Sequence, residues 1–312
     1  MMSGESTAVA FPTVSVVVPT RHRPELLHRA LESILGQRYD GDIEVLVVFD
    51  QEDPLDPGIG SKDGRSIRLL RNERSTGLAG ARNTGILAAM GDYVAHCDDD
   101  DEWLPDKLSL QVERLSSTAT ADVVVTGVSI VYEDRVIDRT PTTDVVDLNQ
   151  LLRSRTQEIH PSSILARRQA YVDGIGLVDE AIPGSYGEDY EWMLRAARRA
   201  PILVVRQPLV RAYWHRTSFF ADRWATIVDA IEYLLARYPE FQGQPRGLAR
   251  LYGRLAFAHA ALGHRSTARL WARRSIRLYP PERRAYLALC VSSGLVSSDR
   301  LLRMAHRTGK GI

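Results

Sequence analysis

Residues 92–105 read D-Y-V-A-H-C-D-D-D-D-E-W-L-P and join an apolar strand to five consecutive acids. Carboxylates a few ångströms apart disfavour one another's ionisation, so such a run is costly unless something compensates the charge. A hard divalent cation, Mg²⁺ or Mn²⁺, relieves that repulsion because it prefers oxygen ligands. Ligands of open α/β sheets bind at the carboxyl ends of strands. The stretch therefore predicts a metal-dependent ligand site at a sheet edge. A solvated acidic turn that caps the next helix is the alternative.

The residues before this stretch alternate between strand and helix patterns. The run V-S-V-V-V at 14–18 is typical of a strand buried on both faces of a parallel sheet. Further strands are predicted at 44–49, 67–71 and 92–97, and helices at 24–37 and 77–90. This order predicts an α/β fold with a mostly parallel sheet, Rossmann-like and flanked by helices.

The second half of the chain changes character along its length. A strand or hairpin arm is expected at 121–132 with Asp134 as a turn residue, then an irregular segment at 136–187. A helix at 188–199 and a strand at 202–206 follow. From residue 223 the apolar spacing is helical, with helices expected at 224–238, 246–262, 266–278 and 282–291. We expect a flexible tail at 1–12, a main domain at 13–222 and a helical region at 223–312.

One part of the helical region, residues 251–280, resembles a single tetratricopeptide unit. A repeat array needs about three units to be stable. We therefore predict a helical hairpin packed on the main domain. A partner-docking module, or a surface for homo-oligomer formation, is the alternative.

Composition excludes several classes. The 312 residues carry 40 basic and 39 acidic side chains, a net charge of +1, which argues against a nucleic-acid binder. The two distant cysteines, Cys97 and Cys290, favour a reducing compartment. The N-terminus lacks the basic region of a signal peptide, and no apolar run is long enough for a membrane span. We expect a cytoplasmic protein. Contact of its Arg-rich C-terminal helices with anionic lipid at the inner membrane face stays open.

Three other segments carry candidate chemistry. Residues 72–85, N-E-R-S-T-G-L-A-G-A-R-N-T-G, place Gly77 at a helix start, where backbone can approach an anion. Arg82 on that helix could reach a diphosphate or form a surface salt bridge. The loops at 19–23 and 49–53 follow the first two strands, and Asp50 could accept a hydrogen bond from a base imide. Residues 187–192, G-E-D-Y-E-W, open a helix with acids that the macrodipole favours in any case, or that include a general base.

Taken in order, these segments resemble the family 2 inverting glycosyltransferases of GT-A fold. The resemblance covers about residues 13–216 and rests on V-S-V-V-V-P-T, N-x4-G-x4-A-R-N-x-G, G-D-Y-V-A-H-C-D-D-D-D-E-W-L-P-D-K-L and G-E-D-Y. It implies a nucleotide-sugar donor at the strand ends and a divalent metal, Mg²⁺ or Mn²⁺, that bridges the donor diphosphate.

The resemblance also implies roles for individual residues. Thr20, Arg21 and Asp50 would hold the nucleoside, and Arg82 would lie near the diphosphate. The D-x-D element maps within Asp98–Asp101, with Asp98 and Asp100 as its named acids, Asp99 in the variable place and Asp101 as a further acid. The implied donor-binding set is Pro19, Thr20, Arg21, Asp50, Gly77, Arg82, Asp98, Asp99 and Asp100. The metal is expected on Asp100, with Asp101 and with His215 of Y-W-H-R-T-S, and the role of His160 stays open.

The pair Glu188–Asp189 resembles the catalytic E-D motif, in which the aspartate is the base. The sequence thus predicts a metal-assisted inverting transferase that moves a sugar, from a UDP-sugar by preference, to a hydroxyl of a glycan, a lipid-linked sugar or a small molecule. D-Q-E-D at 50–53 departs from the common D-G-S, which leaves the nucleoside open. Two alternatives are a nucleotidyltransferase, disfavoured because T-R-H-R-P-E lacks glycine and lysine, and a silent nucleotide-sugar-binding module.

Overall fold

The computed structural model describes residues 11–132, 135–155, 158–214, 223–298 and 300–301. Its strands are β1 (Val14–Thr20), β2 (Ile43–Phe49), β3 (Arg65–Arg71), β4 (Tyr93–His96), β5 (Asp101–Trp103), β6 (Val123–Tyr132), β7 (Arg135–Arg139), β8 (Val145–Val146), β9 (Leu165–Arg167) and β10 (Ile202–Tyr213). Its α-helices are α1 (Pro24–Leu35), α2 (Leu78–Ala88), α3 (Lys107–Ser116), α4 (Leu148–Arg153), α5 (Glu188–Arg199), α6 (Trp224–Arg237), α7 (Pro245–Ala261), α8 (Arg265–Leu278) and α9 (Arg283–Ser292). Shorter helical turns are η1 (Pro161–Ser163), η2 (Ala170–Gly174), η3 (Pro183–Ser185) and η4 (Pro239–Gly243).

The strands form one mixed sheet in the order β3-β2-β1-β4-β9-β6-β10-β5, with β7 on β6 and β8 on β10. β1 is parallel to β2 and β4, and β2 is parallel to β3. The carboxyl ends of β1, β2 and β4 therefore meet at one edge. β9 runs antiparallel between β4 and β6, and β5 runs antiparallel to β10. This is the predicted α/β architecture, with an added antiparallel half.

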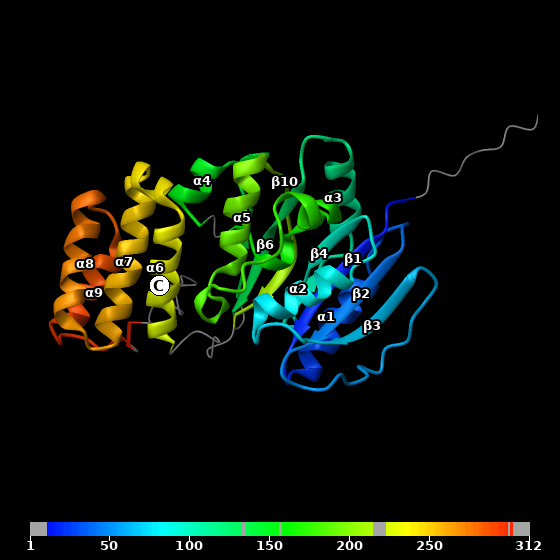
Figure 1. Cartoon of the computed structure of the whole chain (residues 1–312), viewed down its shortest axis with the longest axis horizontal. Helices are drawn as coiled ribbons and strands as arrows, with labels where there is room; N and C mark the ends of the chain where they lie inside the picture. The colour runs from blue at the N-terminus through cyan, green and yellow to red at the C-terminus, as the bar shows by residue number, and fades with distance from the viewer. Residues whose placement is uncertain (1–10, 133–134, 156–157, 215–222, 299, 302–312) are drawn as a thin grey trace, which may run out of the picture.

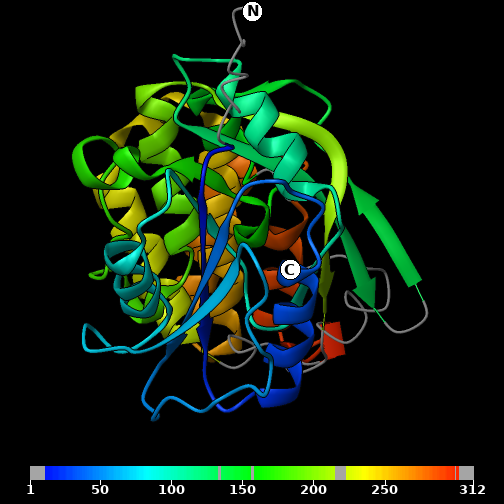
Figure 2. The same ribbon diagram turned by 90° about the vertical axis from the view of Figure 1, so that its right-hand side faces the viewer.

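Side-chain alternation along β1 separates the two cores of the sheet. Val16 and Val18 pack with Leu27 and Leu31 of α1 on one face, and Val17 belongs to the core of the other face. Successive side chains of a strand point to opposite faces, so a fully apolar strand must be covered twice. In Figure 2 the blue helix α1 lies on one side of strands β1 to β3 and α2 lies on the other side, and the C-terminal helices lie farther from the viewer.

The C-terminal helices continue the second core. Leu248 and Leu251 of α7 share a buried cluster with α5 and α6, and Figure 1 shows α5 between the sheet and α6–α7. Helices α7, α8 and α9 pack together through small buried residues, among them Ala256, Ala268 and Ala285. Helices α7 and α8 form the predicted hairpin. The boundary near residue 222 stays a prediction, and Asp134 and residues 215–222 lie outside the described residues.

Two features differ from the predicted elements. The strand after α5 continues to Tyr213, because a register shift on both sides of Pro208 lets β10 stay paired with β6 although proline lacks an N–H. The irregular segment at 136–187 contains three short strands and α4, which are too short to show a periodicity. Within the described ranges, every helix is too short or too polar to cross a lipid bilayer.

Candidate functional site

The ends of β1, β2 and β4 bring the predicted donor residues to one edge of the sheet. Pro19 and Thr20 pair in register with Val48 and Phe49, so Asp50 follows directly beside the end of β1. The Thr20 hydroxyl donates a hydrogen bond of 2.8 Å to Asp99, which follows β4. Three loops far apart in the sequence thus meet here because parallel strands end at the same level.

Asp50 joins the loop after β2 to the start of α2. Its carboxylate accepts hydrogen bonds from Asn72 Nδ2 at 2.7 Å and from the Gly77 N–H at 3.2 Å. Burial favours the neutral acid, but the hydrogen bonds from Gln51, Asn72 and Gly77 and the charge of Arg21 lower the pKa of Asp50. Gly77 has a φ of 109°, a backbone conformation that favours glycine. Asp50 is therefore an ionised acceptor at the helix start.

The four aspartates after β4 take different partners. Asp98 accepts from Arg82 at 2.6 Å, and Arg23 contacts both Asp99 at 3.2 Å and Asp100 at 3.0 Å. Burial and the three neighbouring aspartates raise the pKa of Asp100 to about 7. Because cations satisfy some of the carboxylates and burial opposes the charge of another, the run carries less negative charge than its sequence indicates.

Asp101 faces a different set of groups. Its Oδ2 accepts from the Ser162 hydroxyl at 2.5 Å and lies 3.1 Å from His160 Nδ1. Donor atoms of Asp98, Asp101 and His160 lie within 4.8 Å of one another. Burial opposes the imidazolium, yet Asp101 raises the pKa of His160 to about 9. The positive charge of a protonated His160 offsets the charge of the carboxylates, and a bound cation would do the same. Two carboxylates and an imidazole are a donor set that suits a divalent metal.

The structure therefore assembles a metal candidate that overlaps the predicted one only in part. Asp101 belongs to both sets. Asp100, the expected ligand, forms an ion pair with Arg23, and His215 lies outside the described residues. His160, whose role the sequence left open, takes a place in the cluster.

Arg82 links this edge of the sheet to helix α5. Its side chain is 2% exposed, and it donates to Asp98 and to Glu188. Burial disfavours the guanidinium, but the charges of Asp98, Glu188 and Asp189 raise its pKa. Since its terminal nitrogens already bind two carboxylates, Arg82 acts in this structure as a bridge between the two predicted acid motifs.

A tight turn sets the start of α5. Gly184, Ser185 and Gly187 all have positive φ values, and the Ser185 hydroxyl accepts a hydrogen bond of 3.2 Å from the Ala79 N–H of α2. A non-glycine residue at φ 55° costs about 1 kcal/mol or more, which that bond helps to offset. The turn holds Glu188 and Asp189 against α2 and the acids that follow β4.

The two acids at the start of α5 have opposite protonation tendencies. Arg155 Nη2 lies 2.9 and 3.1 Å from the two Asp189 oxygens. Burial disfavours the Asp189 carboxylate, but Arg155 and Arg82 lower its pKa. Burial raises the pKa of Glu188 to about 7, with Asp189 adding to the effect and Arg82 opposing it. Neighbouring acids with separated pKa values are typical of acid–base catalysis, and the ionised one is Asp189.

Sequence reasoning missed Arg23, Arg155 and Ser162. Arg155 lies in an irregular segment 34 residues before Asp189, and Ser162 lies 61 residues after Asp101, so no local spacing marks them. Arg23 is in the quoted T-R-H-R loop, where a second arginine at the end of β1 was the available signal.

Comparison with known proteins agrees with this fold. In *Escherichia coli*, UDP-Glc:alpha-D-GlcNAc-diphosphoundecaprenol beta-1,3-glucosyltransferase WfgD is 27% identical over 143 residues, 45% of this chain and 55% of that protein. The match spans between about a third and just over half of the length of most curated relatives of this chain.

Two solved structures share the fold at low identity. One is *Staphylococcus aureus* TarS 1-349 in complex with UDP, with a TM-score of 0.60, 17% identity and coverage of 96% of this chain and 92% of that one. The other is the mannosyltransferase PcManGT from *Pyrobaculum calidifontis* in complex with GDP-Man and Mn²⁺, with a TM-score of 0.56, 18% identity and coverage of 92% and 87%.

The family model described as Glycosyl transferase family 2 matches residues 15–174, which is half of the chain. That range includes all of β1 but its first residue, strands β2 to β4, the four aspartates and His160. The chain belongs to glycosyl transferase family 2.

Proposed function

We propose that the chain transfers a sugar from a nucleotide-diphosphate sugar to an acceptor hydroxyl, with inversion at the anomeric carbon. Asp189 takes the acceptor proton while the acceptor oxygen forms a bond to the anomeric carbon. The bond from that carbon to the donor diphosphate breaks, and the nucleoside diphosphate leaves with the electron pair. Residues 13–222 carry this chemistry in the proposal, and 223–312 form the helical region.

The observation that carries the proposal is the state of Asp189. It is buried, yet Arg155 and Arg82 lower its pKa, so it is ionised at neutral pH and able to accept a proton. It lies at the amino end of α5, joined through Glu188 and Arg82 to Asp98. A general base must lie within reach of the site where the donor binds.

The residues around the acids suit a donor diphosphate with a divalent cation. Asp98, Asp101 and His160 would hold the cation, and a bound cation supplies positive charge that stabilises a leaving diphosphate. An imidazole beside two carboxylates favours Mn²⁺ over Mg²⁺, because imidazole is the softer ligand. Arg23, beside Asp99 and Asp100, would add a fixed positive charge at this edge.

The comparisons support a UDP-sugar as the donor. WfgD is named as a UDP-Glc transferase, TarS is in complex with UDP, and PcManGT is in complex with GDP-Man and Mn²⁺. Asp50, Thr20 and Arg21 would contact the nucleoside at the ends of β1 and β2. A cytoplasmic location, with peripheral contact at the inner membrane face, is part of the same proposal.

The test is Asp189→Asn, with turnover measured against a panel of nucleotide sugars with Mn²⁺. Removing a general base lowers turnover by about 10²–10⁴-fold, and binding of UDP by calorimetry should stay close to that of the parent. Asp229→Asn on α6 is the matched control, because Asp229 is an exposed helical aspartate. Near-normal turnover of Asp189→Asn would refute the assignment.

A further inference from the structure

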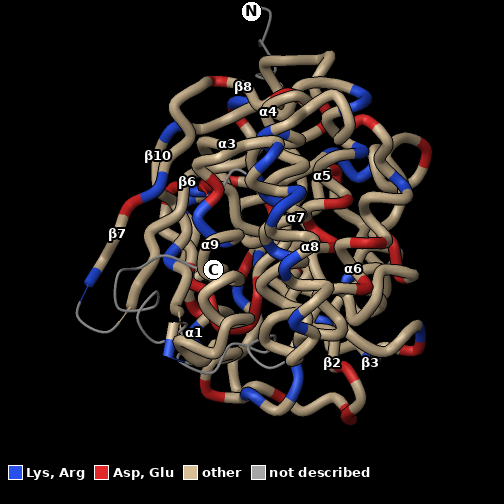
Figure 3. Tube along the Cα trace, turned by 90° about the vertical axis from the view of Figure 1, so that its left-hand side faces the viewer, with Lys and Arg blue, Asp and Glu red and all other residues tan. Residues whose placement is uncertain are grey.

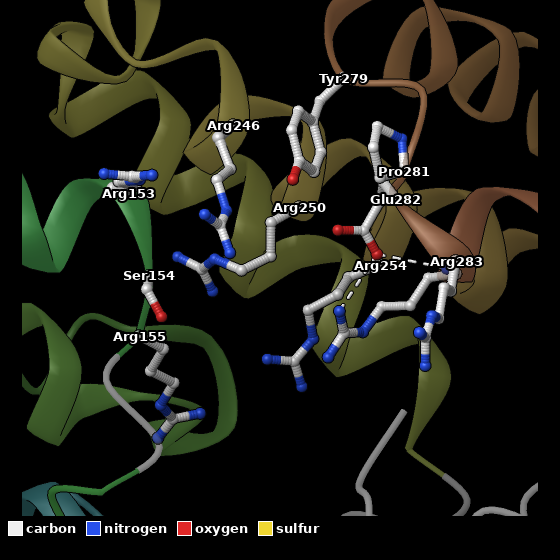
Figure 4. Close-up of a pocket in the computed structure, with 11 residues that line it drawn as sticks. Arg153, Ser154, Arg155, Arg246, Arg250, Arg254, Tyr279, Pro281, Glu282 and Arg283 are labelled. Atoms are coloured by element: carbon white, nitrogen blue, oxygen red, sulfur yellow. Dashed lines mark hydrogen bonds and ion pairs between the residues drawn. The ribbon is translucent and has the colours of Figure 1, made fainter.

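A basic cavity of about 430 Å³ lies on the side of α5 away from the sheet. Residues from the end of α4, from α7 and from the start of α9 line it. Figure 4 shows their side chains converging on a common space. Its volume falls in the range of about 300–1,000 Å³ that is usual for small-molecule sites. It is large enough for the charged group of a substrate.

Arginines dominate the lining of this cavity, which we call the arginine pocket. Arg246, Arg250 and Arg254 follow one another at four-residue intervals and so share one face of α7. Figure 3 shows basic segments along α7 on this side of the molecule. Arg153 and Arg155 add two cations from the α4 side, and Arg283 and Arg284 add two from α9.

One acid, Glu282, opposes these seven arginines among the described residues that line the pocket, and Arg284 binds it at 3.1 Å. The formal charge of the lining is therefore seven minus one, or +6. The Nε atoms of Arg250 and Arg284 are buried and have no hydrogen-bond partner among the described residues. Burial and the charges of Arg284, Arg155 and Arg250 lower the pKa of Arg254 to about 10. Cations gathered in this way repel one another unless an anion lies between them.

The arginine pocket adjoins the proposed base. Arg155 lines the pocket and binds Asp189, and Arg250 Nη2 donates to the Tyr190 hydroxyl at 3.0 Å. Arg254 donates to the Tyr186 hydroxyl, on the turn that sets Asp189. An anion bound in the pocket would thus share Arg155 with Asp189, the proposed base.

The donor diphosphate does not account for this charge. The donor residues lie at the ends of β1, β2 and β4, and the pocket is lined by α4, α7, α9 and the segments beside them. The anion therefore belongs to the other substrate. Arginine forks match phosphate oxygens in pairs, and six net charges suit a polyvalent group.

We propose that the arginine pocket binds a phosphate or diphosphate group of the acceptor and so presents the acceptor hydroxyl to Asp189. The proposal rests on the function proposed above. It names the substrate class that the sequence left open: a sugar that already carries a phosphate or a diphosphate. The reaction that supplies this acceptor is accordingly one that places a phosphate or a diphosphate on a sugar.

The test is binding of inorganic pyrophosphate to the full chain by calorimetry, with UDP and Mn²⁺ present to occupy the donor side. The variant Arg153→Gln/Arg246→Gln/Arg283→Gln removes three exposed cations, so the fold is retained. We expect the Kd to rise at least about tenfold, since each lost contact is charge-assisted. Arg273→Gln, an exposed arginine on α8 outside the pocket, should bind as the parent does. Equal binding by the triple variant and the parent would overturn the proposal.

A second arm identifies the source of the phosphate. Acceptor KM is compared for a soluble glycosyl diphosphate, the same compound on a polyprenyl chain, and the unphosphorylated sugar. The triple variant should raise KM for the two diphosphates. The increase is equal for both if the pocket contacts the charged group alone, and it is larger for the lipid form if the pocket also contacts the polyprenyl chain. A parent that uses the unphosphorylated sugar as well as the diphosphates would contradict the proposal. If the triple variant loses pyrophosphate binding but Asp189→Asn is fully active, the proposed base is refuted and the anion-binding role of the pocket is supported.

Discussion

Arg155 Nη2 contacts both carboxylate oxygens of Asp189, at 2.9 and 3.1 Å, across 34 residues of chain. Arg155 also lines the arginine pocket. One side chain therefore touches both the proposed base and the proposed acceptor site. A change at this contact should be visible in the pH dependence of the reaction.

Arg155→Gln should move the acidic limb of the pH profile of kcat to higher pH. The Arg155 charge lowers the pKa of Asp189, and the base acts only when it is ionised. Without that charge the pKa of Asp189 rises, so activity is lost at a higher pH as the solution is acidified. Profiles of kcat for the parent and for Arg195→Gln, whose cation pairs with Glu191, provide the comparison. An unshifted limb would show that Arg155 does not control the base.

Asp101→Asn should weaken Mn²⁺ binding more than Asp100→Asn does. Asp101 shares a cluster with Asp98 and His160, whereas Asp100 forms an ion pair with Arg23. Loss of an outer-shell partner already costs about 10–100-fold in metal affinity, so loss of a ligand should cost at least that. Calorimetry of Mn²⁺ in the presence of UDP ranks the two variants. The reverse order would place the metal on Asp100, as the sequence alone predicted.

Lys107→Met should flatten the dependence of stability on pH above neutrality. Lys107 is fully buried, with its Nζ 2.7 Å from Gln111 Oε1 and 3.7 Å from the centre of the Trp103 ring. Burial lowers its pKa to about 7, from 10.5. Between these values the unfolded chain binds a proton that the folded chain does not. The free energy of unfolding therefore rises with pH in that window, by at most about 1.4 kcal/mol per unit.

Urea unfolding at pH 7, 8 and 9 measures that slope for the parent and for Lys107→Met. The variant also removes the donor to Gln111 Oε1, while Gln111 Nε2 keeps its bonds to the Val124 and Ser163 carbonyls. An acceptor left without its donor costs about 1–3 kcal/mol at every pH and so does not change the slope. The Trp103 ring favours the ammonium and makes the slope smaller than its upper limit. Equal slopes for the two proteins would mean that Lys107 stays protonated in the fold.

Gly247→Ala should destabilise the contact between the helical region and the main domain. A Cβ at Gly247 would lie 1.9 Å from the Leu152 carbonyl oxygen of α4, a backbone atom that cannot turn aside. Overpacking of this kind costs about 1–3 kcal/mol. Gly243→Ala is the control, because a Cβ there meets nothing within 4 Å. Thermal unfolding should show a lower Tm for Gly247→Ala alone, and equal values for both variants would contradict the close approach.

The sequence predicted the sheet and most of the helices because their signals are local. β1 and β2 are continuous β-branched and apolar runs, and α5 begins and ends at the predicted residues Glu188 and Arg199. The strands between 135 and 167 were missed, since strands of two to five residues are too short to show a clear period. Their places are decided by pairing partners such as β6 and β10.

By itself the sequence determined the α/β order, the membership of the family and the acids to which the proposed chemistry is assigned. Only the tertiary structure decided how the four aspartates are shared among Arg23, Arg82 and the pair Ser162–His160. The physical reason is that consecutive side chains point in different directions and their partners lie 16 to 77 residues away. The arginine pocket has the same origin: α7 supplies a row of cations that its sequence shows, but α4 and α9 turn that row into a cavity beside Asp189.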